Sequence, residues 1–131
     1  MTCAKIYELN PSLMESSGII QKLKKVLRDS DNPLVICNTL LSLSEIEKTK
    51  GEKLIETDAV FVKKIVDSLP ECSEWGQVSI LEILCIMDIK DLKSAEYIVD
   101  RVLSRLSHIN PAVIVAAIKV ILKYSLVLNN Q

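Results

Sequence analysis

Apolar residues recur along this 131-residue chain at the spacing of an α-helix, and this periodicity limits its fold more than any other feature. Three segments, at residues 19–27, 61–69 and 95–106, each carry one apolar stripe and a charged back. Three more, at 34–47, 75–87 and 112–128, are apolar on most sides and need cover from neighbours. With only 3 Gly and 4 Pro, the chain lacks the turn residues of a β-sandwich, so it is predicted to be all-α.

Predicted helix starts recur at a regular interval. Asn32-Pro33 and Asn110-Pro111 each place a capping residue before a proline at the first helical position, and Ser73 and Asp91 are further candidate caps. The two Asn-Pro starts lie about 80 residues apart and the Ser73 start falls near their midpoint, which gives a period of about 40 residues. This period is typical of HEAT and armadillo repeats, so we expect one α-solenoid segment of about three helix pairs, at roughly 1–50, 51–90 and 91–131.

The mean hydropathy of +0.28 is high for a self-contained globule of this size. The excess lies in the broadly apolar segments, above all 112–128, and residues 3–9 resemble the tail of an inner helix. Polar capping repeats, which end a natural solenoid, are not visible in the sequence. We therefore expect a piece of a longer superhelical subunit, with exposed apolar surface at its termini and on its inner face.

Charge and targeting signals exclude several classes of protein. Sixteen basic and seventeen acidic residues leave a formal net charge of −1, so no nucleic-acid partner is expected. The first residues lack the basic region and apolar run of a signal peptide. Segment 112–128 is shorter than the roughly 20 residues of a membrane span and contains Lys119 and Lys123, so no transmembrane helix is expected.

Motifs for catalysis and metal binding are lacking. The cysteines, Cys3, Cys37, Cys72 and Cys85, show no Cys-x-x-Cys spacing, and His108, the one histidine, is distant in sequence. We expect no metal, no cofactor, and reduced cysteines packed as small apolar residues of an intracellular protein. The sequence has no Gly-rich phosphate loop, Gly-x-Ser-x-Gly or His-Glu-x-x-His motif, so no enzyme is expected. His108 is expected in a turn near a helix end.

Two features are candidate binding sites. Trp75-Gly76-Gln77 places a glycine in the first turn of a helix, where it costs up to about 1 kcal/mol relative to alanine. This cost indicates a specific requirement for glycine, such as the close approach of a neighbouring backbone. The string is either a partner contact centred on Trp75 or a tight packing point with the indole N–H bonded internally. The densest basic cluster is a candidate contact with anionic lipid or simply a solvated face, and its members are Lys22, Lys24, Lys25 and Arg28.

The longest break in the helical pattern, at residues 51–58, holds two further features. The basic cluster of Lys48, Lys50 and Lys53 lies in and before it, with the same two interpretations. Leu54-Ile55-Glu56-Thr57-Asp58 comes near a clathrin-box pattern, but Thr57 stands where the fourth position should be apolar. The alternative is that Leu54 and Ile55 pack the loop down while Thr57 or Asp58 caps the next helix.

Four strings resemble the N-terminal trunk of β-adaptins, the large β subunits of clathrin adaptor complexes. They are residues 4–11 (AKIYELNP), 43–46 (LSEI), 71–77 (ECSEWGQ) and 105–113 (RLSHINPAV). The resemblance covers essentially the whole chain in order, and it is closest to the β chains of the first and second adaptor complexes. It identifies the chain as similar to a trunk fragment of that family.

This resemblance implies a role in vesicle-mediated protein transport. A β-adaptin trunk holds a second large, a medium and a small subunit in a complex that is peripheral on coated vesicles, the Golgi or the plasma membrane. Clathrin contact would then come from hinge and appendage regions outside this segment. Two alternatives stay open: a coatomer-type or transport-receptor solenoid that resembles a β-adaptin by convergence, and a module that binds anionic lipid directly through its lysines.

Overall fold

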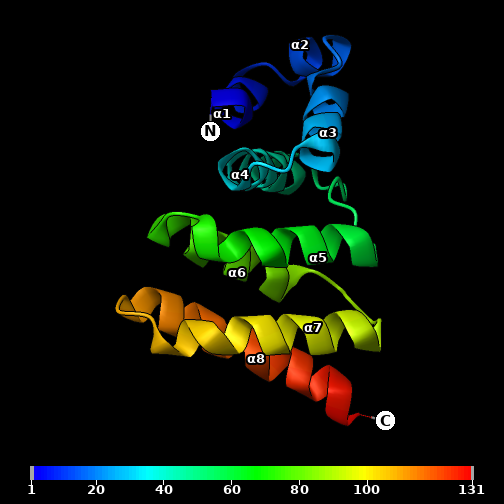
Figure 1. The fold of residues 1–131 in the computed structure, drawn as a ribbon. Helices are drawn as coiled ribbons and strands as arrows, with labels where there is room; N and C mark the ends of the chain where they lie inside the picture. Colours follow the sequence, from blue (N-terminus) through cyan, green and yellow to red (C-terminus); the bar gives the residue numbers. More distant parts are fainter. Residues whose placement is uncertain (1, 131) are drawn as a thin grey trace. The chain divides into compact units, whose positions relative to one another are not determined.

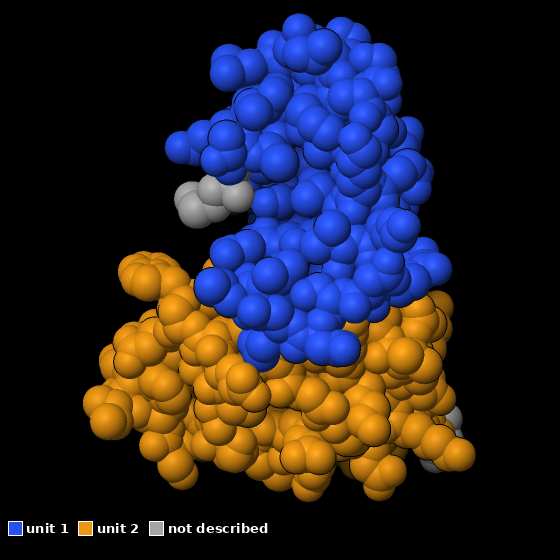
Figure 2. Space-filling view, turned by 45° about the horizontal axis from the view of Figure 1, so that its top comes forward, with its two compact units in different colours: residues 1–56 blue, residues 57–131 orange. Residues whose placement is uncertain are grey.

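A computed structural model describes residues 2–130, and 81% of this part of the chain is helical, with no strand. The all-α prediction is therefore confirmed. The chain divides into two compact units, residues 1–56 and 57–131, which Figure 2 shows in separate colours. Each unit has its own apolar core.

Unit 1 contains α1 (Thr2–Leu9), α2 (Pro11–Ser16), α3 (Ile19–Asp29) and α4 (Pro33–Lys50). Both α1 and α3 pack against α4, the longest helix of the unit (Figure 1). The core of the unit consists of side chains with at most 3% exposure, among them Tyr7, Met14, Leu27, Leu40 and Leu43. The short helix α2 was not predicted, although Asn10-Pro11 carries the same start signal as Asn32-Pro33, and the Asn10 side chain caps it.

Unit 2 contains α5 (Ala59–Ser68), the 3₁₀ turn η1 (Leu69–Glu71), α6 (Glu74–Ile86), α7 (Leu92–Leu103), the 3₁₀ turn η2 (Ser104–Ser107) and α8 (Pro111–Asn129). Within this unit α5 packs on α7, and α8 packs on both α6 and α7 (Figure 1). Ile65, Ile80, Leu84, Ile98 and Val120 are fully buried between these helices.

The predicted caps are confirmed. The Asn32 side chain accepts from the backbone N–H groups of Leu34 and Val35, and that of Asn110 accepts from Ala112. Ser73 and Asp91 cap α6 and α7 in the same way. Since each cap satisfies N–H groups that have no partner inside the helix, these polar residues fix where the helices begin. At the other end of α4, Gly51 has φ 72°, a left-handed conformation that ends the helix.

Candidate partner-binding surface

Trp75 lies in the first turn of α6, and its side chain is 83% exposed. The Ser73 hydroxyl accepts from the backbone N–H of Gly76 at 3.2 Å, which caps this turn. The alternative in which the indole packs internally is therefore wrong for Trp75. Large aromatic residues are usually buried in a folded chain, so this exposure makes Trp75 the leading candidate for a partner contact.

Gly76 and Gln77, the other two members of the predicted partner contact, are buried. Gln77 Nε2 donates to the backbone oxygen of Cys72 at 3.0 Å, and Gln77 Oε1 accepts from Arg105 at 3.5 Å. The glutamine thereby links α6 to η2 and to Cys72, the residue that follows η1. Of the three residues only Trp75 offers side-chain surface, while its neighbours build the turn beneath it.

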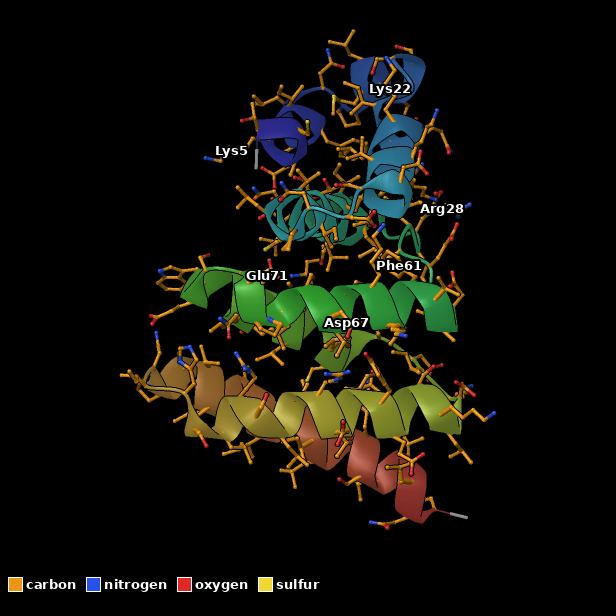
Figure 3. The ribbon with its side chains drawn as sticks, in the orientation of Figure 1. Lys5, Lys22, Arg28, Phe61, Asp67 and Glu71 are labelled. Carbon is orange, nitrogen blue, oxygen red and sulfur yellow. The ribbon has the colours of Figure 1, made fainter. Side chains whose placement is uncertain are left out.

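The basic cluster of Lys22, Lys24, Lys25 and Arg28 lies on α3, where Figure 3 labels Lys22 and Arg28. Lys22, Lys25 and Arg28 are exposed, whereas Lys24 is half-buried. Arg28 forms an ion pair with Glu56. Lys22 and Lys25 are therefore the members whose charge is most accessible to an anionic surface, and lipid contact stays a prediction.

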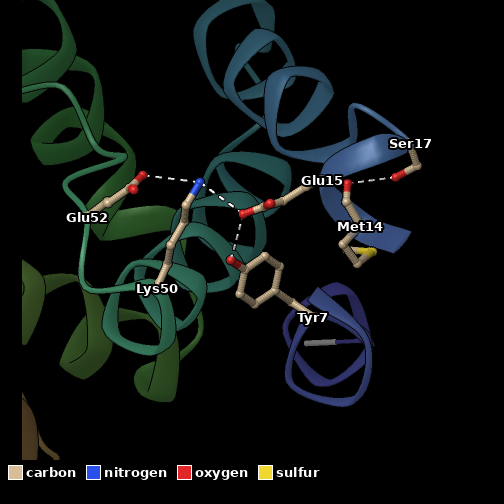
Figure 4. Close-up of polar contacts among 6 residues, drawn as sticks. All are labelled: Tyr7, Met14, Glu15, Ser17, Lys50 and Glu52. Carbon is tan, nitrogen blue, oxygen red and sulfur yellow. Dashed lines mark hydrogen bonds and ion pairs between the residues drawn. The ribbon is translucent and has the colours of Figure 1, made fainter. Parts of the chain in front are cut away.

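In the second basic cluster Lys50 serves a contact within unit 1. Its Nζ lies 3.2 Å from Glu15 Oε1 and 3.1 Å from Glu52 Oε2, and Tyr7 donates a hydrogen bond to the same Glu15 oxygen at 3.2 Å (Figure 4). Hydrogen bonds to Glu52 and Glu15 raise the pKa of Lys50, while the bond from Lys50 lowers the pKa of Glu15. This network joins α1, α2 and the end of α4. Lys48 and Lys53 remain exposed.

The loop with the near-match to a clathrin box is folded against unit 1. The Glu47 Oε2 atom accepts from the backbone N–H groups of Leu54 at 2.8 Å and Ile55 at 3.0 Å, and Leu54 is buried. Asp58 caps α5 by accepting from Phe61 N at 2.9 Å. These bonds match the packed-loop interpretation, and a motif held this way does not offer the extended segment that peptide recognition needs.

His108 and the cysteines take part in local packing. His108 lies in the predicted turn, between η2 and α8, and its Nδ1 accepts from Asn110 N at 3.0 Å. Cys37 and Cys72 are buried, as expected, while Cys3 and Cys85 are half-buried, and none of the four is in a disulfide. Within residues 2–130, no group of His, Cys, Asp and Glu side chains is arranged to hold a metal ion.

Helix α8 is long and apolar enough to cross a membrane by length and composition, and 28% of its 18-residue apolar stretch is buried. It nevertheless supplies core residues of unit 2, and Val113 and Tyr124 are fully buried. Lys123 donates to the backbone oxygens of Cys85, at 2.7 Å, and Met87. Helix α8 therefore buries one face in the core of unit 2 and places Lys123 at the end of α6. This agrees with the expectation that α8 is a packed helix.

The helices of each unit bury an apolar face against their neighbours, and this arrangement is that of an all-α helical-repeat protein. The chain belongs to the Cnd1 family, described as non-SMC mitotic condensation complex subunit 1, because the model of that family matches residues 1–123.

Several curated relatives are similar to the chain residue by residue. It is 40% identical over 121 residues to the AP-1 complex subunit beta of Dictyostelium discoideum and 39% identical over 122 residues to the AP-1 complex subunit beta-1 of Homo sapiens. It is 36% identical over 119 residues to the AP-2 complex subunit beta of Schizosaccharomyces pombe. The predicted resemblance to β-adaptins is thereby confirmed. These matches take in 91% to 92% of the chain but only 13% to 17% of each relative's length.

Proposed function

We propose that this chain is a scaffold segment of a β subunit in a clathrin-associated adaptor complex that acts in vesicle-mediated protein transport. The observation that supports this most strongly is the 39% to 40% identity to AP-1 β subunits over 92% of the chain. A helical-repeat pattern can recur in unrelated complexes, so the family model alone is a weaker guide to function than this residue-level identity. The role is structural and not catalytic.

The proposed partners are the second large, the medium and the small adaptor subunits, with clathrin bound through regions outside this segment. Membrane association is peripheral, on the cytoplasmic side of coated vesicles, the Golgi or the plasma membrane. Exposed apolar side chains on α8 support a role in subunit contact, since Val115, Leu122 and Leu126 are 51% to 62% exposed.

A pull-down of the polypeptide that contains this chain, from its own cells, tests the proposal. We expect one second large, one medium and one small adaptor subunit to co-purify in comparable amounts. Recovery of SMC proteins, of coatomer subunits or of nuclear cargo in their place would contradict it. The first of these outcomes would favour the condensation-complex role that the family description names.

Direct binding to anionic lipid is a second candidate, supported by the exposure of Lys22 and Lys25 on one helix. A few such lysines near an anionic surface contribute about 1 kcal/mol each. Co-sedimentation with phosphatidylserine vesicles, at low and at physiological salt, should then fall in a Lys22→Glu/Lys25→Glu variant. A Lys90→Glu/Lys93→Glu variant, which reverses two exposed lysines of unit 2, is the charge-matched control, and equal binding by all three proteins would exclude this role.

A further inference from the structure

Two large apolar side chains are almost fully exposed at one end of unit 2. Ile109, in the turn before α8, is 97% exposed, and Trp75, at the start of α6, is 83% exposed. A hydrogen bond of 2.8 Å from Asn110 Nδ2 to Glu74 Oε2 joins the two turns that carry them. Trp75 and Ile109 are each the chain neighbour of one partner in that bond, and we refer to them as the Trp75–Ile109 surface.

The backbone beneath this surface is held at several points. Ser73 and Asn110 cap the two helices, and Gln77 is buried with bonds to Cys72 and Arg105. Figure 1 shows the start of α6 and the turn before α8 at the same end of the unit. Because the turns are fixed before any partner arrives, binding here would require little ordering of the backbone.

Exposed acidic side chains accompany the apolar ones. Glu74, which directly precedes Trp75, and Glu71, four positions before it and labelled in Figure 3, are both exposed. Arg105, the nearest basic residue in the adjoining turn, is half-buried and donates to Gln77 and Ser104. The exposed charged side chains that lie closest to Trp75 in the sequence, Glu71 and Glu74, are therefore both acidic, although the net charge of the chain is only −1.

We propose that the Trp75–Ile109 surface binds a basic amphipathic segment of a partner protein. Apolar side chains of that segment would cover Trp75 and Ile109, and its lysines or arginines would meet the carboxylates of Glu71 and Glu74 and the face of the indole. Tryptophan is enriched among the residues that dominate binding energy at protein interfaces. This proposal does not rest on the adaptor role, because it uses only the residues of unit 2.

The test uses the fluorescence of Trp75, which is the only tryptophan of the chain and lies within the proposed surface. The full 131-residue chain is titrated with a synthetic helical peptide of repeating Lys-Leu-Leu-Lys, and in parallel with a Glu-Leu-Leu-Glu peptide of equal length. Neither probe contains tryptophan. We expect the basic peptide to shift the emission to shorter wavelength in a saturable manner and to bind at least about tenfold more tightly than the acidic one.

Three variants that keep Trp75 locate the contact. Ile109→Ser and Glu71→Lys should each weaken binding of the basic peptide by about five- to tenfold, whereas Ile86→Ser should change it less than about twofold. Ile86 is a matched control because it is 65% exposed at the opposite end of α6. Circular dichroism checks that each variant is folded. Absence of a shift, equal affinity for both peptides, or undiminished binding by Ile109→Ser and Glu71→Lys would overturn the proposal.

Discussion

Replacement of Tyr124 by phenylalanine should destabilise unit 2 through one hydrogen bond. The Tyr124 hydroxyl is fully buried and donates to the backbone oxygen of Leu84 at 2.7 Å, with a longer contact of 3.3 Å to that of Met87. Met87 also accepts from Lys123, so it keeps a partner in the variant, whereas Leu84 loses this one. Losing a hydrogen bond and leaving a buried carbonyl without it costs about 1–2 kcal/mol.

This cost can be measured by urea unfolding, followed by far-UV circular dichroism. With a slope of about 1.5 kcal/mol per molar urea, the midpoint of Tyr124→Phe should fall by roughly 1 M. Tyr97→Phe is the matched control, because Tyr97 is half-buried and its hydroxyl donates to Asp67 on the surface. Its free energy of unfolding should change by less than about 0.5 kcal/mol. An unchanged midpoint for Tyr124→Phe, or a larger loss for Tyr97→Phe, would refute the reasoning.

High pH provides a second readout of the same group. Burial raises the pKa of Tyr124 above its ordinary value of 10.0, so the unfolded chain releases this proton at lower pH than the folded one. The resulting stabilisation is complete below pH 10 and is lost as the pH rises above it. The variant Tyr124→Phe should therefore lose less stability between neutral and strongly alkaline pH than the unaltered chain does.

Two further predictions concern Glu15 and Asn110, which take no part in the hydrogen bond of Tyr124. The hydrogen bond from Lys50 lowers the pKa of Glu15 below its ordinary value of 4.5. The ionised Glu15 therefore stabilises the folded chain above that pH, and this stabilisation is lost as the pH falls below it. The melting temperature of a Glu15→Gln variant should accordingly fall with a smaller slope at acidic pH. A slope identical to that of the unaltered chain would argue against this. Asn110→Ala removes the cap of α8 and should lower the free energy of unfolding by about 1 kcal/mol in the urea assay, whereas Asn110→Ser, which keeps a capping oxygen and adds no charge beside Glu74, should lose less.

The helices and their caps could be predicted from the sequence because both depend on residues close together in the chain. Apolar spacing marked α3 to α8, and Asn32, Ser73, Asp91 and Asn110 marked four of the starts. The same reasoning missed α2, although the Asn10-Pro11 signal was present. A single turn carries too few apolar positions to show a period, so only the capping signal could have revealed it.

Contacts between one helix and another, or between a helix and a loop, could not be predicted in this way. The Tyr124 hydroxyl donates to Leu84 across 40 positions, and Glu47 accepts from the backbone of Leu54 and Ile55 in the following loop, because packing sets a register that periodicity does not contain. The exposure of Trp75 has the same origin. Its position in the first turn of α6 gave no indication of which side would face outward, and the ordinary burial of tryptophan favoured the wrong alternative.

Helix α8 divides its apolar side chains between two faces. One face anchors unit 2 through Val113, Val120 and Tyr124, which are fully buried, while the other exposes Leu122 and Leu126 by 61% and 62%. Exposed apolar side chains also lie on α1 and α2, as expected, but Trp75 and Ile109 show that they are not confined to the terminal helices. Since the two faces belong to one rigid helix, a partner that covers the outer face also holds the core face in place. Binding at α8 should therefore stabilise unit 2 by mass action, in proportion to the logarithm of partner concentration once the site is nearly saturated.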